Sequence, residues 1–147
     1  MKLPDDVSRH LRGVRHVGVV TEDSEALVAR LQQLFGLQDG EIQRVASPDT
    51  RFVFLAVGGM PYEIIEPVSA RFRQILLKQP GVNHVCYNVD DLDAAVAAMQ
   101  AHGVRLGHVT PDGIVTTPAS RMAYFDPDDT AGMLIEFVQA LAPASAA

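Results

Sequence analysis

Two similar stretches, VRHVGVV at residues 14–20 and VNHVCYNV at residues 82–89, decide the fold of this 147-residue chain. Each stretch is rich in β-branched residues, and each carries a histidine at its third position, His16 and His84. Runs of this composition are typical of β-strands. The sequence therefore predicts two strands that present a histidine at equivalent positions.

The segments that follow the two stretches also match. Each histidine lies seven residues before an aspartate, and each aspartate precedes an amphipathic segment that ends at a glycine. Aspartate is a favoured N-cap and glycine a favoured helix end, so we expect a helix after each strand. Further strand-like runs then follow in each half: residues 41–45, 51–57 and 62–66 in the first, and residues 105–109, 121–125 and 133–138 in the second.

This order indicates an internal repeat of one strand–helix–strand–strand–strand unit. We expect an α+β fold in which two βαβββ modules form a curved mixed sheet that cups a metal site. The chain is interpreted as one domain, residues 1–147, with module one at about 14–67, a linking helix at about 69–79 and module two at about 82–139. Gly58-Gly59 predicts a tight hairpin turn inside module one.

Composition excludes several classes of protein. The formal net charge is −6, with 12 Lys and Arg against 18 Asp and Glu, and no basic run argues for nucleic-acid binding. Cys86 is the single cysteine, so an intrachain disulfide cannot form. The apolar runs are too short to span a bilayer, and the first residues do not resemble a signal peptide. We expect a cytoplasmic protein that binds neither nucleic acid nor membrane.

The last strand of each predicted module carries a glutamate between apolar residues, Glu63 in YEII and Glu136 in LIEF. A buried carboxylate usually needs a cation or a hydrogen-bond partner. Two imidazoles and two carboxylates form a suitable cage for one divalent ion. His16 and Gly18 share a strand face, and we expect Gly18 to leave room beside the metal for an incoming ligand.

The run from residue 16 to residue 139 resembles the vicinal-oxygen-chelate superfamily, and within it the methylmalonyl-CoA epimerases. The resemblance implies that His16, Glu63, His84 and Glu136 bind one divalent metal, which the sequence leaves open among Co, Mn, Ni, Zn, Mg and Fe(II). It also implies a homodimer. The matching segments are His16-Val17-Gly18-Val19, Gly58-Gly59, Glu63-Ile64-Ile65-Glu66-Pro67, Asn83-His84-Val85, Val89-Asp90-Asp91-Leu92, His102-Gly103-Val104-Arg105-Leu106 and Gly132-Met133-Leu134-Ile135-Glu136.

The activity implied by the resemblance is that of a metal-dependent epimerase or isomerase. It would transfer the α-proton of an acyl-CoA such as methylmalonyl-CoA through a metal-stabilised enolate. Glu136 is the first candidate for the base, and Glu63 is the second. A small-molecule substrate, here a CoA thioester, is then the expected partner.

Two other functions stay open at this point. A glyoxalase-type lyase or isomerase would use the same four ligands on a thiol adduct, and a drug-binding resistance module would use the cleft without metal. Several other polar side chains are interpreted as structural: Glu66 as solvated or salt-bridged, Cys86 as a wall of the cavity, Arg71, Arg73 and Lys78 as a solvated helix face, and His10, His102 and His108 as surface residues.

Overall fold

The computed structural model describes residues 7–108 and 110–142. Its contacts divide the chain into two compact units, one made of residues His16–His84 and the other of the segments before and after it. Strands β1 (Leu11–Val20) and β5 (Gly81–Val89) each run through both units. The expected end of a strand at Val109 lies outside the described residues.

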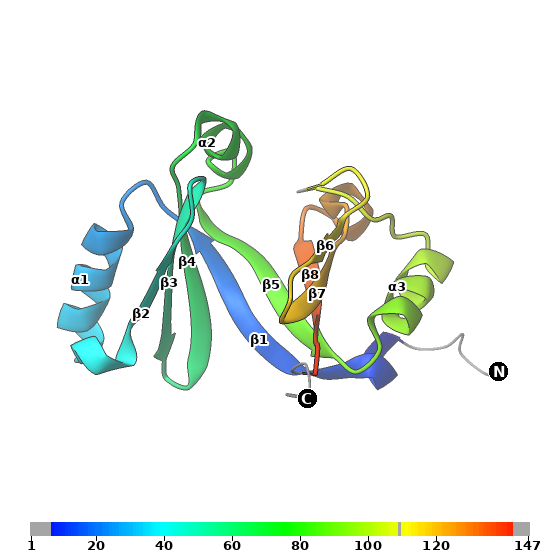
Figure 1. Cartoon of the computed structure of the whole chain (residues 1–147), viewed down its shortest axis with the longest axis horizontal. Helices are drawn as coiled ribbons and strands as arrows, with labels where there is room; N and C mark the ends of the chain where they lie inside the picture. The colour runs from blue at the N-terminus through cyan, green and yellow to red at the C-terminus, as the bar shows by residue number, and fades with distance from the viewer. Residues whose placement is uncertain (1–6, 109, 143–147) are drawn as a thin grey trace. The chain divides into compact units, whose positions relative to one another are not determined.

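The unit of residues 16–84 contains a four-stranded mixed sheet (Figure 1). Strands β2 (Gln43–Ala46), β3 (Thr50–Val57) and β4 (Met60–Pro67) follow one another as an antiparallel meander, and β4 then pairs in parallel with β1. Gly58 and Gly59 have φ angles of 59° and 80°, a conformation that glycine adopts without strain. The predicted hairpin between β3 and β4 is therefore confirmed.

Helices cover the two faces of this sheet differently. Helix α1 (Ser24–Phe35) packs along one face, where Val28 meets Val53 and Ile64 (Figure 1). Helix α2 (Ala70–Leu76) packs on the opposite face through Leu76, which joins Val20 and Ile65 in a smaller core. Because side chains alternate along a strand, the face that carries Val20 and Ile65 also carries the residues two positions earlier. A short 3₁₀ helix, η2 (Asp39–Glu41), precedes β2.

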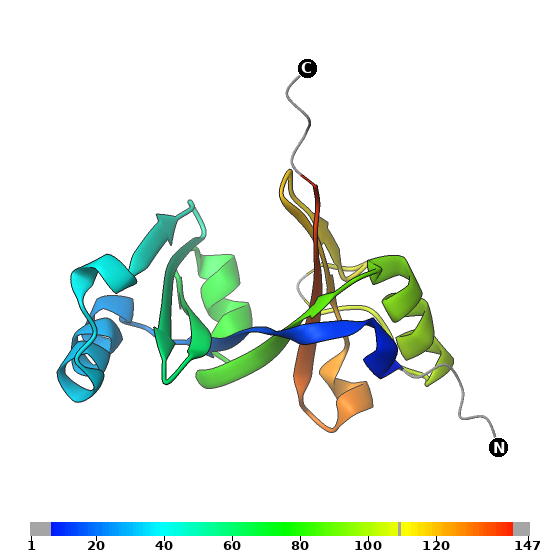
Figure 2. The same cartoon turned by 90° about the horizontal axis from the view of Figure 1, so that it is seen from below.

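The second unit also has a sheet with a helix packed against it. Its sheet has the order β5-β8-β7-β6, and helix α3 (Leu92–Ala101) contributes Leu92, Ala95 and Met99 to a core with Phe125 and Phe137. The 3₁₀ helix η1 (Val7–His10) lies beside α3 (Figure 2). The remaining elements are β6 (Ile114–Thr116), β7 (Ser120–Tyr124), η3 (Pro127–Thr130) and β8 (Leu134–Ala140).

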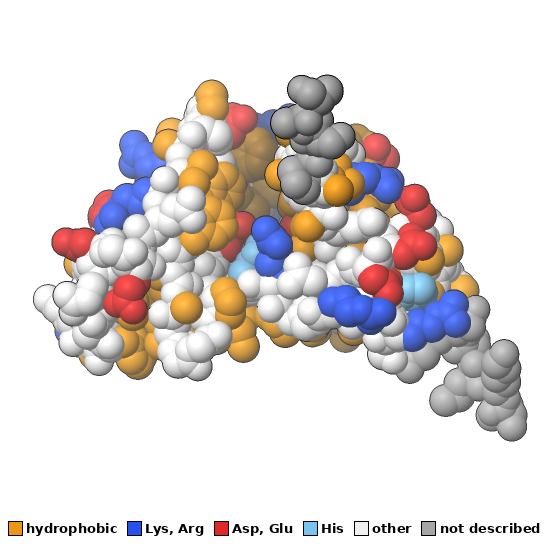
Figure 3. Space-filling view, turned by 60° about the horizontal axis from the view of Figure 1, so that its bottom comes forward, with side chains coloured by type: hydrophobic (Ala, Val, Ile, Leu, Met, Phe, Trp, Pro, Cys, Tyr) orange, Lys and Arg blue, Asp and Glu red, His pale blue; other side chains and the backbone are white. Residues whose placement is uncertain are grey.

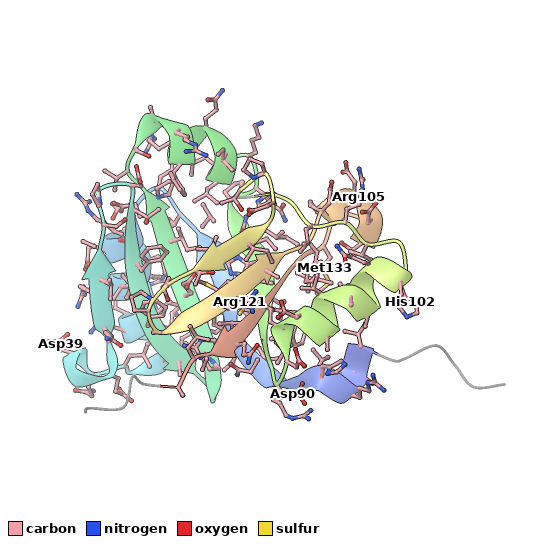
Figure 4. The ribbon with its side chains drawn as sticks, turned by 45° about the vertical axis from the view of Figure 1, so that its right-hand side comes forward. Asp39, Asp90, His102, Arg105, Arg121 and Met133 are labelled. Atoms are coloured by element: carbon pink, nitrogen blue, oxygen red, sulfur yellow. The ribbon has the colours of Figure 1, made fainter. Side chains whose placement is uncertain are left out.

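One predicted strand, at residues 105–109, is wrong. Of the described residues 105–108, only Leu106 makes an isolated bridge, to Phe125, and the second strand of this module is instead β6, which the sequence analysis missed. The backbone N–H and the guanidinium of Arg105 both donate to Asp129 in η3. Figure 4 shows the ribbon of η3 beside the labelled Arg105. Because the Arg105 amide already donates to η3, it does not donate to a neighbouring strand. Residue 105 therefore lies in a loop.

With β6 in place, each module has the order βαβββ, and the predicted α+β class is confirmed. The two helices that follow β1 and β5 begin at Asp23 and Asp91, as expected from the repeat. Among the described residues, no helix is long and apolar enough to cross a membrane.

Candidate metal centre

Three of the four predicted ligands lie together inside the unit of residues 16–84. His16 comes from β1, Glu63 from β4 and His84 from β5. In the parallel pairing of β1 with β4, Gly18 lies opposite Glu63. Because His16 and Gly18 share a face of β1, Glu63 lies on the same face of the sheet as His16. The two histidines are 7% and 5% exposed, and the side chain of Glu63 is 16% exposed. The residues thus form a largely buried polar group on the sheet face opposite α1.

The ligating atoms of this triad converge. The Nε2 atoms of His16 and His84 are 3.1 Å apart. The Glu63 carboxylate lies 3.7 Å from Nε2 of His16 and 3.9 Å from Nε2 of His84. Ligands of a divalent metal lie about 2.0–2.2 Å from the ion, so two of them are separated by about 3–4 Å. The spacing of the three groups therefore fits one divalent metal.

Gly18 allows this arrangement in a way that differs from the prediction. A Cβ atom at position 18 would lie 2.1 Å from Cε1 and 2.3 Å from Nδ1 of His84. The imidazole of His84 therefore occupies the space above Gly18, and that space is not left for an incoming ligand. The prediction that Gly18 leaves space for an incoming ligand is therefore wrong, because the side chain of His84 fills that space.

Besides the two histidines, Glu63 has apolar neighbours. Its antiparallel neighbour on β3 is Phe54, whose ring stacks on that of Phe52 with centroids 6.3 Å apart. On the same face, Val20 and Ile65 are covered by α2. A carboxylate in such a place has few water molecules to solvate it, which favours a cation or a hydrogen-bond donor beside it.

Glu136, the fourth predicted ligand, lies in the other unit. It is 3% exposed on β8, and its cross-strand neighbour on β7 is Tyr124. Cys86 is also buried in this unit, at 1% exposure. The role of Glu136 as a metal ligand stays a prediction.

The sequence analysis missed one residue at the centre. Asn83 is 5% exposed, and its Oδ1 lies 3.0 Å from Nδ1 of His84. An Asn directly before a candidate ligand is a weak signal in sequence, because neighbouring side chains on a strand usually point to opposite faces.

Other polar residues have structural partners. Glu66 is buried and accepts hydrogen bonds from Ser24 and Arg51, so the expected salt bridge is confirmed. His10 was expected at the surface, but its side chain is only 12% exposed and lies 3.1 Å from the Asp90 carboxylate. The hydrogen bond with His10 keeps the pKa of Asp90 below its usual value, and Arg12 adds to this effect. These contacts tie η1 and β1 to the start of α3.

Surface charges form local pairs. On the face drawn in Figure 3, basic side chains lie among acidic ones. Arg44 donates two hydrogen bonds to Glu25, which lowers the pKa of that carboxyl group, and Arg121 does the same to Asp93. Both carboxyl groups are well exposed, so each pair adds little to stability.

Comparisons with known proteins agree with this architecture. A family model described as the glyoxalase/bleomycin resistance protein/dioxygenase superfamily matches residues 15–125. The human mitochondrial methylmalonyl-CoA epimerase is 25% identical over 136 residues, which are 89% of this chain and 76% of the relative. The ethylmalonyl-CoA/methylmalonyl-CoA epimerase of Cereibacter sphaeroides is 26% identical over 131 residues, 86% of this chain and 96% of the relative.

A solved structure gives the same relationship. The crystal structure of methylmalonyl-CoA epimerase from Mycobacterium tuberculosis superposes with a TM-score of 0.68 at 26% identity. The superposition covers 91% of this chain and 89% of that protein.

Proposed function

The chain belongs to the glyoxalase/bleomycin resistance protein/dioxygenase superfamily, and from this premise we propose that it is a metal-dependent epimerase. Its substrate would be an acyl-CoA such as methylmalonyl-CoA, which is named as the substrate of the relatives in human and in C. sphaeroides. The observation that carries the proposal is the convergence of His16, Glu63 and His84, whose ligating atoms are 3.1–3.9 Å apart.

Four residues would hold the metal: His16, Glu63 and His84, with Glu136 as the fourth ligand. A divalent metal bound there supplies Lewis-acid stabilisation of the negative charge that develops on a carbonyl oxygen. The mixed set of imidazole nitrogen and carboxylate oxygen suits first-row divalent metals. Support for Glu136 comes from its burial on β8 and from its place in the repeat, equivalent to that of Glu63.

Glu136 is also our candidate for the group that takes the α-proton, with Glu63 second. Either carboxylate offers an oxygen that accepts a proton, and epimerisation requires the proton to return on the opposite face of the α-carbon. The apolar neighbours of Glu63, Phe54 among them, would keep water from the reacting carbon and limit side reactions.

The first test is exchange of the α-proton of methylmalonyl-CoA in deuterium oxide, followed by NMR. In the metal-loaded protein, Glu136→Gln is expected to slow exchange by about 10²- to 10⁴-fold, the usual contribution of general acid–base catalysis. Metal content should be measured in the same samples, because the Gln side chain still offers an oxygen ligand. Unchanged exchange in Glu136→Gln would remove this residue from the proton-transfer role.

A control with a glutathione hemithioacetal separates the second enzyme class. Turnover of this thiol adduct, together with no exchange on methylmalonyl-CoA, would favour a glyoxalase-type lyase. If the native protein binds no divalent metal even after reconstitution, the drug-binding module becomes the better account. A homodimer in the cytoplasm completes the proposal, and sedimentation equilibrium measures the oligomeric state.

A further inference from the structure

Asn83 is buried next to the candidate metal centre and has no part in the ligand set described above. Its carboxamide Oδ1 lies 3.0 Å from Nδ1 of His84, within hydrogen-bond distance. Asn83 is 5% exposed, so water competes little for this bond. We propose that Asn83 is a positioning residue that selects the tautomer of His84 in which Nε2 carries the lone pair that would bind the metal. This inference rests on the proposed metal centre.

The chemistry of the two groups sets the direction of the bond. A carboxamide oxygen only accepts hydrogen bonds, so the hydrogen must come from Nδ1 of the imidazole. A neutral imidazole carries one N–H, and with that hydrogen on Nδ1 its Nε2 bears a lone pair. In this tautomer Nε2 of His84 is the acceptor of the 3.1 Å hydrogen bond with Nε2 of His16, and it lies 3.9 Å from the Glu63 carboxylate. Asn83 therefore exposes the lone pair of His84 on the side where the other ligands converge.

Gly18 supplies a second constraint on the same ring. The ring of His84 lies against the backbone of β1, where even a methyl group at position 18 would overlap it. The ring of His16 stands edge-on to it, with an interplanar angle of 78°. With one side of the ring against Gly18 and Nδ1 bound to Asn83, both the position and the protonated nitrogen of His84 are defined. Metal-ligating histidines commonly need such an outer partner.

Removing the carboxamide of Asn83 should remove the constraint on the tautomer of His84. In Asn83→Leu, whose side chain has the same number of heavy atoms and the same branching, His84 can carry its hydrogen on Nε2, where it blocks the ligating atom. Loss of an outer-shell partner typically weakens metal binding by about 10- to 100-fold. In Asn83→Asp the carboxylate still accepts from Nδ1, so this variant should retain the wild-type tautomer and keep at least the wild-type affinity.

The decisive experiment reads the tautomer directly. Long-range ¹H–¹⁵N correlation spectra of the metal-free protein, at alkaline pH where imidazoles are neutral, report which nitrogen of His84 is protonated. The expected result is Nδ1–H in the wild type and in Asn83→Asp, with Nε2–H populated in Asn83→Leu. Competition titration with Zn²⁺ on the same three proteins should show the loss of affinity only in Asn83→Leu.

Three results would overturn the inference. The first is an Nε2–H tautomer in the wild-type protein, which can be read even if Asn83→Leu does not fold. The second is an unchanged tautomer and affinity in Asn83→Leu. The third is an equal loss of affinity in both variants, because a purely structural role would not be rescued by Asp. None of these readouts involves methylmalonyl-CoA, so a failure of the proposed enzymatic activity would be recognised separately.

Discussion

Single residues with no chemistry of their own set the geometry of the candidate centre. Gly18 has no catalytic group, yet its missing side chain is the reason that the imidazole of His84 can lie against β1. The parallel pairing of Gly18 with Glu63 then places the carboxylate on the neighbouring strand. The arrangement of the ligands therefore depends on a position where any larger side chain would conflict with His84.

Substitution Gly18→Ala tests this dependence. The added methyl group must displace the His84 ring or shift β1, and overpacking of this kind costs about 1–3 kcal/mol. We expect a lower free energy of unfolding in urea and a loss of bound metal by elemental analysis. Gly40→Ala is the matched control, because nothing lies within 4 Å of a Cβ at that position. Equal behaviour of the two variants would contradict the steric role of Gly18.

At the scale of elements, the repeat is visible in how the two long helices begin. The side chain of Asp23 accepts a hydrogen bond from the backbone N–H of Ala26 at 3.0 Å, and Asp91 accepts one from Ala94 at 3.1 Å. Both aspartates have nearly the same extended backbone, with φ of −142° in each. The same local solution thus directs the chain from each histidine-bearing strand into the helix that covers its module.

Removing either cap should destabilise the protein by a similar amount. Asp23→Ala and Asp91→Ala each leave a backbone N–H at the helix start without its side-chain acceptor. The expected decrease in the free energy of unfolding is about 1 kcal/mol for each, measured by urea titration. Asp23→Asn and Asp91→Asn should stay close to the wild type, because Asn is an equally good cap. A cost confined to one of the two sites would show that the helices do not depend equally on their caps.

At the scale of the whole molecule, the candidate ligands connect parts of the chain that are far apart in sequence. His16, Glu63 and His84 lie on three different strands, and β1 and β5 each continue into the second unit. A metal held by these residues binds the folded chain, because the unfolded chain does not bring the ligands together. A metal at the proposed centre would therefore link its binding to folding.

Removing metal should accordingly lower the thermal stability. An ion present at about 1,000 times its dissociation constant stabilises the folded state by about 4 kcal/mol. We expect the Tm of the metal-loaded protein to fall on treatment with a chelator and to recover when the ion is restored. His84→Ala should abolish this response. If the Tm of the wild type is independent of metal while elemental analysis shows the ion bound, the ion is not held by the folded arrangement described here.

The sequence by itself determined the features that depend on local chemistry. The β-branched runs around His16 and His84, the Asp caps and the Gly58-Gly59 turn each stabilise one conformation through neighbouring residues, so they were predictable. Strand β6 was missed because three residues, Ile114–Thr116, become a strand only through pairing with β7. The loop at Arg105 likewise depends on Asp129, 24 residues away.

Only the tertiary structure decided the geometry of the candidate centre. The sequence pointed to His16, Glu63 and His84, but their separations of 3.1–3.9 Å depend on how β1, β4 and β5 come together. The contact of His84 with Gly18, a position 66 residues away, reversed the expected purpose of that glycine. Such contacts between distant segments have no local signal, because the energy that orients a ring comes from whatever the fold packs against it.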